Sequence, residues 1–225
     1  MGAWSVKVGI WESEGRILTR IKPMLFNTDM VKAILDGRKT VTRRICKDGN
    51  DFAVPDMDFY DADKRTYAVH NYANREHTEK LSIEERTCPI CPGDSLYVRE
   101  TWAEWTGGYL YKAWNSPFAQ PGRMPVMTWR PSIHMPREAA RIWLKVKDVR
   151  AEQLCSMKLD DFLSEGVCIR PEAFNDPESA RMQAENEFIE LWNSTISKGQ
   201  QNLYGWTANP WVWAIEFEQC ERPKR

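Results

Sequence analysis

Residues 37–44 have the sequence Gly-Arg-Lys-Thr-Val-Thr-Arg-Arg, in which a glycine precedes four cations and two threonines. The residues before it place Met30, Val31, Ile34 and Leu35 on one apolar stripe at helical spacing. Asn27 or Thr28 is available as the N-cap, and Gly37 as the residue that ends the helix. The stretch therefore predicts a short helix that opens into a basic segment. The plainest alternative for this segment is a solvated basic turn, since short Lys/Arg clusters are common on protein surfaces.

Other stretches alternate apolar and polar residues with the period of two that is typical of strands. In Ser95–Glu100, the side chains of Leu96, Val98 and Glu100 share one face, which puts a carboxylate on the apolar side. Ile142, Leu144 and Val146 repeat the pattern, as do Trp211, Trp213, Ile215 and Phe217. We expect one closed or nearly closed barrel that contains strands near Thr40–Ile45, Ser95–Glu100, Arg141–Val149 and Trp211–Gln219.

The remaining segments predict short helices and loops. Phe162 and Leu163 before Gly166 indicate a brief helix, and Asp176-Pro177 is a good start for a longer one, with a stripe of Ala184, Phe188, Leu191 and Trp192. Residues 107–136 are punctuated by glycine and proline, which favours loops and a short hairpin. Residues 48–87 have weak periodicity and indicate a surface excursion that is partly ordered at best and could act as a lid. Strands outnumber helices without regular alternation, so the expected class is α+β, a small β-barrel decorated with short helices.

The chain of 225 residues is long enough for one sizeable core. We expect residues 21–219 to form a single domain with the inserted excursion at about 48–87. Residues 1–20 are an N-terminal extension in which Trp4, Val6, Val8 and Ile10 alternate as in an edge strand, and residues 220–225 are a tail.

Composition excludes several classes of protein. The formal net charge of -1 gives no global attraction for polyanions, so nucleic-acid binding would need a local patch. No run approaches the roughly 18 apolar residues of a membrane-spanning helix, and no signal-peptide core is present, so we expect a cytoplasmic protein without a membrane partner. The motifs GxGxxG, GxxxxGK[ST], HExxH and GxSxG are all missing.

The six cysteines are expected to be reduced thiols. Cys88-Pro-Ile-Cys91 could supply half of a tetrahedral zinc site, but no second CxxC or spaced histidine pair completes it. We therefore expect a turn with two incidental thiols, no metal and no cofactor.

Five stretches of the chain together resemble the ASCH (activating signal cointegrator homology) domain family of the PUA-like superfamily. Gly37, Lys39, Thr42 and Arg44 match its GxKxxTxR pattern. The prophage-associated branch is similar in further segments, namely Lys22-Pro-Met-Leu-Phe26, Pro92-Gly-Asp-Ser-Leu-Tyr-Val-Arg-Glu-Thr-Trp102, Trp129-Arg-Pro-Ser-Ile-His-Met-Pro-Arg137 and Asn209-Pro-Trp-Val-Trp213. The resemblance spans about residues 21–219, and one departure is the N-terminal twenty residues, which that branch usually lacks.

The resemblance implies a PUA-like barrel whose cleft binds a nucleoside or single-stranded RNA. In one bacterial branch it also implies an amidohydrolase that deacetylates N4-acetylcytidine with a Lys, a Thr and a Glu, which correspond here to Lys39, Thr42 and Glu100. Thr42 would be the nucleophile and Lys39 the base that activates it, provided that burial or neighbouring cations lower the pKa of Lys39. Because Lys39 and Thr42 would face opposite sides of one strand, Lys39 must lie in the loop before that strand.

Further residues are expected around the same cleft. Glu100 would accept a hydrogen bond from the exocyclic nitrogen of the base or pass a proton to the leaving amine, and its alternative is a structural ion pair with Arg44. The candidates for phosphate or base contacts are Arg38, Arg43, Arg44, Arg99, Trp102 and His134. Core packing of the tryptophan and a plain loop histidine are the alternatives. A non-catalytic RNA or modified-base binding module, or a ribonuclease, stays open as the alternative function.

Overall fold

The computed structural model describes residues 19–47, 53–74, 76–106, 108–113, 128–171 and 175–223, which form an α+β protein with more strands than helices. The strands are β1 (Ile21–Leu25), β2 (Val41–Ile45), β3 (Ala53–Asp61), β4 (Thr66–Tyr72), β5 (Lys80–Thr87), β6 (Ser95–Arg99), β7 (Trp102–Trp105), β8 (Gly108–Tyr111), β9 (Trp143–Gln153) and β10 (Trp211–Cys220). The helices are α1 (Thr28–Leu35), α2 (Leu159–Ser164), α3 (Pro177–Thr195) and α4 (Gln201–Tyr204), with 3-10 turns between them.

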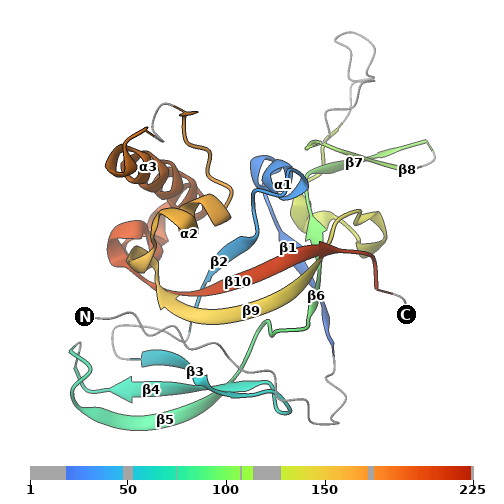
Figure 1. The fold of residues 1–225 in the computed structure, drawn as a ribbon. Coiled ribbons are helices and arrows are strands. Elements are labelled where there is room, and N and C mark those ends of the chain that lie inside the picture. The colour runs from blue at the N-terminus through green and yellow to red at the C-terminus, as the bar shows by residue number, and fades with distance from the viewer. Residues whose placement is uncertain are drawn as a thin grey trace.

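The central element is a five-stranded sheet in the order β1-β6-β9-β10-β2. β1 pairs with β6 in parallel, and all other neighbours are antiparallel. The four strands that the alternation predicts are all in this sheet. β9 and β10 are the longest pair and curve across the middle of the molecule (Figure 1).

The sheet is curled, but its backbone pairing stays open. β1 and β2 are its two edges, and in the described residues no ladder joins them. The Arg44 side chain on β2 bridges this gap, since its Nη2 donates to the Leu25 carbonyl at 2.7 Å and its Nε lies 3.2 Å from the Met24 sulfur. The expectation of a barrel therefore holds for its strands and its curl, while closure of the ladder is not seen.

The bend between α1 and β2 positions the basic segment. The Asn27 side chain accepts from Met30 N at 2.8 Å and caps the helix, and Gly37 ends it with a φ of 74°. The amides of Arg38 and Lys39 then both donate to the Ala33 carbonyl. Lys39 forms an isolated β-bridge with Glu165, and β2 begins further along the chain, at Val41. Lys39 therefore lies in the loop before β2, as expected from its odd sequence separation from Thr42.

β10 separates two apolar cores. Its Trp213, Ile215 and Phe217 enter the larger core, which includes residues of β6 and β9. Val212 points the other way into a second core with Phe162 of α2 and residues of α3. The helices lie on one side of β10 in Figure 1 and the β3-β4-β5 sheet on the other. The predicted helices near 162 and from Asp176 are confirmed, and Asp176 caps α3 by accepting from Glu178 N and Ser179 N.

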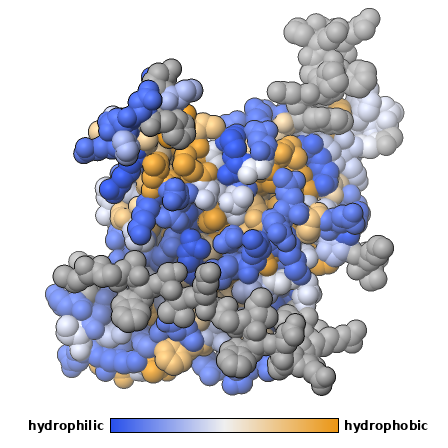
Figure 2. Space-filling model, in the orientation of Figure 1, coloured by the Kyte–Doolittle hydropathy of each residue, from blue (hydrophilic) through white to orange (hydrophobic). Residues whose placement is uncertain are grey.

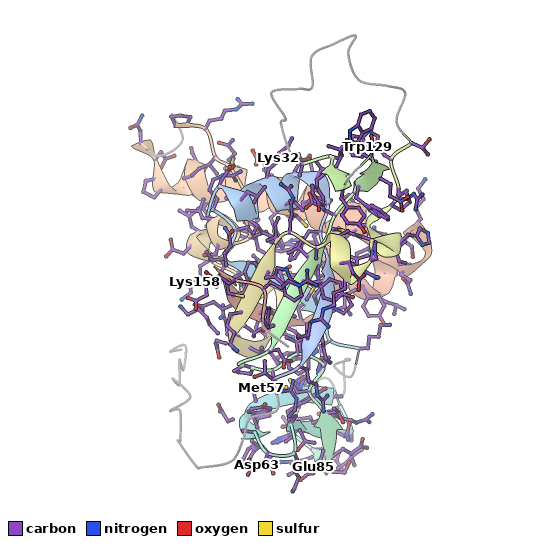
Figure 3. The ribbon with its side chains drawn as sticks, turned by 90° about the vertical axis from the view of Figure 1, so that its right-hand side faces the viewer. Lys32, Met57, Asp63, Glu85, Trp129 and Lys158 are labelled. Atoms are coloured by element: carbon purple, nitrogen blue, oxygen red, sulfur yellow. The ribbon has the colours of Figure 1, made fainter. Side chains whose placement is uncertain are left out.

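Residues 53–87 correct the sequence analysis. Apart from residue 75, they form the antiparallel sheet β3-β4-β5 in place of a weakly ordered excursion. The middle strand β4 is partly buried, since Tyr67, Ala68 and Val69 are buried and Tyr67 packs edge-on against Trp213 with ring centroids 4.7 Å apart. All residues of β5 are exposed. Met57, Asp63 and Glu85 mark this sheet at the end of the molecule opposite Lys32 of α1 and Trp129 (Figure 3).

Further expectations concern the rest of the chain. The sequence predicts a short hairpin within residues 107–136. The observed hairpin begins earlier, with β7 and β8 paired from Trp102–Tyr111 to Trp105–Gly108, and only β8 lies in the predicted range. The expected N-terminal edge strand lies outside the described residues, and so do residues 48–52 and 114–127. Among the described residues, no helix combines the length and the apolar character needed to span a bilayer.

Candidate active site at the start of strand β2

Lys39 and Glu165 form a buried pair. The Lys39 amine donates to the Glu165 carbonyl oxygen at 2.9 Å and to its carboxylate oxygen Oε2. The two residues are 2% and 4% exposed. Gly166 allows this approach, because a Cβ on it would lie 2.8 Å from Ala33 Cβ and 3.1 Å from Lys39 Cβ. The end of α2 is thus packed directly on the residue that the sequence predicts as a base.

Burial lowers the pKa of Lys39 from its ordinary value of 10.5. The Glu165 carboxylate acts in the opposite direction, and the charges of Arg44 and Arg43 add to the lowering. The net direction is the one that a catalytic base requires, because only the neutral amine can accept a proton.

Thr42 lies on β2 with its hydroxyl buried and without a hydrogen-bond partner among the described residues. The residue is 1% exposed. A buried hydroxyl with no partner costs about 1–3 kcal/mol, so this position is unfavourable for folding alone. The hydroxyl group belongs to a residue that lines a small cavity of about 20 Å³ together with Met30, Arg43, Arg44, Glu165, Phe188, Leu191, Trp192 and Thr195.

Arg43 is fully committed to carboxylates. It donates to Glu152 at 2.7 Å, to Asp161 at 2.8 Å and to Glu165 at 3.3 Å. Burial alone would lower its pKa, but these three carboxylates raise it.

Arg44 is also occupied, by β1 and by the Phe26 ring, whose centroid lies 5.2 Å from its guanidinium carbon. Burial lowers its pKa, against a raising effect of Glu165. Arg38, Lys39 and Arg43 therefore each have a carboxylate partner, whereas Arg44 is held by β1 and the Phe26 ring.

Arg38 lies at the mouth of a larger cavity. Its guanidinium donates to Gly166 O at 2.8 Å, to Cys168 Sγ at 3.0 Å and to Asp36 at 3.0 Å. This cavity of about 390 Å³ is lined by Asp29, Arg38, Gly166, Val167, Cys168, Glu187, Glu190 and Leu191. The two cavities adjoin, since they share Leu191 and take consecutive residues at 29–30 and 165–166. On the face seen in Figure 2, apolar side chains gather beside α3, the helix that supplies one wall of both cavities.

Glu100 lies in another environment. Its carboxylate receives two hydrogen bonds of 2.9 Å from Arg141, whose guanidinium carbon is 4.4 Å from the Tyr111 ring centroid. The alternative prediction of an ion pair between Glu100 and Arg44 is wrong, because the Arg44 side chain contacts β1. Lys39 contacts Glu165, and Glu165 lines the cavity of Thr42, but no described contact joins Lys39 to Thr42. The described contacts of the Glu100 carboxylate are with Arg141.

Arg99, Trp102 and His134 belong to the region around the β7-β8 hairpin. Arg99 donates to Met135 O at 2.8 Å, and His134 is exposed in a 3-10 turn. Trp102 is 2% exposed and sits under the guanidinium of Arg130 at 5.1 Å. It is therefore core, as its alternative stated, and cannot stack on a base in this conformation; Trp105 nearby is 48% exposed.

Sequence reasoning missed Glu165, Glu152 and Asp161. The sequence did hold one indication of such residues. Lys39, Arg43 and Arg44 lie at or beside a predicted strand, and buried cations need carboxylate partners. The chain has 32 acidic residues, however, and nothing in the sequence selects these three among them.

The described residues contain no group of three or more His, Cys, Asp and Glu side chains placed to hold a metal ion. Comparison of the chain with known protein families, characterised proteins and solved structures gives no match. The likeness to the ASCH family rests on the sequence motifs quoted above.

Proposed function

We propose that the protein is a PUA-like amidohydrolase that removes the acyl group of an N4-acylated cytidine, with Thr42 as the nucleophile. One observation carries the proposal: the buried, unpartnered Thr42 hydroxyl lines the same cavity as Glu165, the carboxylate that holds Lys39. The resemblance to ASCH proteins independently assigns nucleophile and base to Thr42 and Lys39.

The chemistry requires a neutral amine at Lys39. Within the buried pair, the proton of Lys39 passes to the Glu165 carboxylate. The Thr42 hydroxyl has no hydrogen-bond partner among the described residues, so the neutral Lys39 amine must move within hydrogen-bond reach before it accepts the hydroxyl proton. The Thr42 oxygen attacks the acyl carbon, and the N4 nitrogen leaves as an amine after taking back a proton from the pair. Water then hydrolyses the Thr42 ester by the same route, which restores the free hydroxyl.

The two cavities suggest how the substrate is divided. A volume of about 20 Å³ holds roughly one water molecule, so it excludes a nucleoside, and a small acyl group must displace neighbouring side chains to reach Thr42. The neighbouring volume of about 390 Å³ is in the range of small-molecule sites and could take the nucleoside.

The charges around the larger cavity favour an uncharged ligand. Asp29, Glu187 and Glu190 line it with Arg38, and the Arg38 guanidinium already has three partners. Carboxylates repel phosphates but accept hydrogen bonds from sugar hydroxyls and exocyclic amines. We therefore propose a free nucleoside as the substrate in preference to an RNA strand.

The proposed roles differ from the resemblance at one residue. The resemblance assigns proton transfer to Glu100. In our proposal Glu165 takes this role because it lines the cavity of Thr42, and Glu100 fixes the end of β6 through Arg141.

The competing function is recognition of a modified base without turnover. The occupation of Lys39 by Glu165 favours it, because an amine that keeps its proton activates no nucleophile. In this alternative the ligand binds in the same cavity but is not hydrolysed.

A binding experiment tests the location and the ligand class. Leu191→Trp fills the wall common to both cavities, and Met182→Trp is its control on an exposed position of the same helix. Calorimetric titration with N4-acetylcytidine should show binding by the Met182→Trp protein and a loss of at least about tenfold in the Leu191→Trp protein. The affinity should change little between low and high salt, because no phosphate is neutralised. Tighter binding of single-stranded RNA with a steep salt dependence would contradict the proposal.

A further inference from the structure

Cys88 and Cys91 lie in a buried turn that connects the two large sheets. The turn follows β5 and precedes β6. Cys88 N donates to Arg65 O at 2.8 Å, and Cys91 N donates to the Asp94 carboxylate at 3.0 Å. The same Asp94 carboxylate receives the Arg65 guanidinium at 2.6 Å. The turn is thus held to β4 on one side and to the start of β6 on the other.

The two thiols lie in the same turn. The Cys88 sulfur lies 2.8 Å from the Ile90 carbonyl oxygen, and the Cys91 sulfur lies 3.8 Å from the Cys88 carbonyl oxygen. Both thiols are free and buried. Two free thiols at CxxC spacing in one turn can close a disulfide with little movement of the rest of the fold.

The surroundings make the two thiols unequal. The hydrogen bond from Cys88 lowers the pKa of Cys91 to about 7 against the effect of burial, and Tyr60 and the charge of Arg65 act in the same direction. The contact with Cys91 and burial raise the pKa of Cys88. One thiolate beside one thiol is the arrangement found in redox-active CxxC sites.

A metal site fits the same region less well. Zinc would need two more ligands beside Cys88 and Cys91, and the described residues offer no third His, Cys, Asp or Glu in position. Asp94 is engaged by Arg65 and by two backbone amides, those of Arg20 and Cys91.

We propose that Cys88 and Cys91 are a redox-active dithiol, which a small peroxide oxidises to an intramolecular disulfide. The Cys91 thiolate attacks one oxygen of hydrogen peroxide, which gives a sulfenic acid and hydroxide. The Cys88 sulfur then attacks the Cys91 sulfur and displaces its hydroxyl group, which leaves as water with the Cys88 proton. Peroxide is reduced, the two thiols are oxidised, and an external thiol reverses the reaction.

Oxidation changes the contact between the turn and β3. The disulfide removes the thiolate that Tyr60 and Arg65 face, so Tyr60 loses a charged acceptor. Tyr60 and Ile90 are half-buried and pack against the core that contains both cysteines. We therefore expect faster amide hydrogen exchange at the Tyr60 end of β3 in the oxidised protein.

The test uses the full chain in a Cys155→Ser/Cys168→Ser/Cys220→Ser background, which removes the exposed and half-buried thiols. After treatment with hydrogen peroxide, intact mass should show the loss of two hydrogens, and peptide mapping should join Cys88 to Cys91. Dithiothreitol should restore both thiols. In the Cys88→Ser protein, the sulfenic acid at Cys91 should persist and react with dimedone, whereas the Cys91→Ser protein should resist oxidation at Cys88.

Tyr60→Phe keeps the ring and removes the hydroxyl donor, so it should slow oxidation by about threefold without loss of the fold. The proposal fails if Cys88 and Cys91 stay reduced in the native protein while the same chain oxidises in denaturant, or if the disulfide involves Cys46. It also fails if the purified protein contains zinc that Cys88→Ser or Cys91→Ser releases.

Discussion

The Lys39 amine and the Glu165 carboxylate form a buried ion pair between residues that are 126 positions apart in the chain. The pair ties the loop before β2 to the end of α2. It also places a carboxylate in the cavity of Thr42 and connects to Arg43, whose guanidinium reaches Glu165 at 3.3 Å. The stability of this region and its proposed chemistry therefore depend on the same carboxylate.

Glu165→Gln should be strongly destabilising. The change removes the charge shared by Lys39 and Arg43 and leaves Lys39 without its carboxylate in a buried site. Loss of one partner of a buried ion pair costs about 3 kcal/mol or more. The matched control is Glu152→Gln, which affects the buried Arg43 and the partly exposed Arg150 at a more exposed carboxylate and should cost about 1 kcal/mol. Urea unfolding measures the free energy of unfolding of both variants. Equal losses would contradict the claim that Glu165 stabilises this region more than Glu152 does.

The pKa of Lys39 predicts the pH dependence of stability. Because burial holds this pKa below 10.5, the unfolded chain binds a proton that the folded chain has released as the pH rises toward that value. The free energy of unfolding of the wild type, relative to Lys39→Met, should therefore increase between neutral pH and about pH 10.5, by at most about 1.4 kcal/mol per pH unit. A relative stability that falls over this window would mean that the ion pair, and not desolvation, sets the pKa.

Glu100→Gln should act on stability and spare the chemistry. The carboxylate is buried and accepts both hydrogen bonds from Arg141, which is partly exposed. Loss of the charge should lower the free energy of unfolding by about 2 kcal/mol. The rate of nucleoside deacylation per folded molecule should stay within about twofold of the wild type, a factor that corresponds to less than 1 kcal/mol of the activation free energy. A large loss of turnover with unchanged stability would restore the catalytic role that the family resemblance assigns to Glu100.

The sequence predicts the elements whose signal is local. Asn27 and Gly37 mark the ends of α1, and the alternation in residues 211–219 predicts β10. The bend at Lys39 also follows from local rules, since one strand cannot turn Lys39 and Thr42 to the same side. The β3-β4-β5 sheet escapes prediction because its burial does not alternate: Tyr67, Ala68 and Val69 of β4 are buried in a run, and all of β5 is exposed.

The candidate site is predictable in part for the same reason. Lys39 and Thr42 are close in sequence, so a motif identifies them together. Their carboxylate comes from the loop after α2, and only the packing of Gly166 against Ala33 and Lys39 brings it into place. Composition likewise suggests a basic patch at residues 38–44, although folding pairs Lys39 and Arg43 with buried carboxylates.

Turnover of N4-acetylcytidine by the wild type and by Thr42→Val tests the central claim most directly. Valine has the shape of threonine without its hydroxyl, which has no partner in the fold. Thr42→Val should therefore keep or raise the melting temperature, by an amount equivalent to about 1 kcal/mol, while turnover measured by the release of cytidine falls by at least about a thousandfold. Thr42→Ser, which keeps the hydroxyl, should retain measurable activity. A wild-type protein that binds N4-acetylcytidine without hydrolysing it, or a Thr42→Val protein that hydrolyses it at the wild-type rate, would contradict the account.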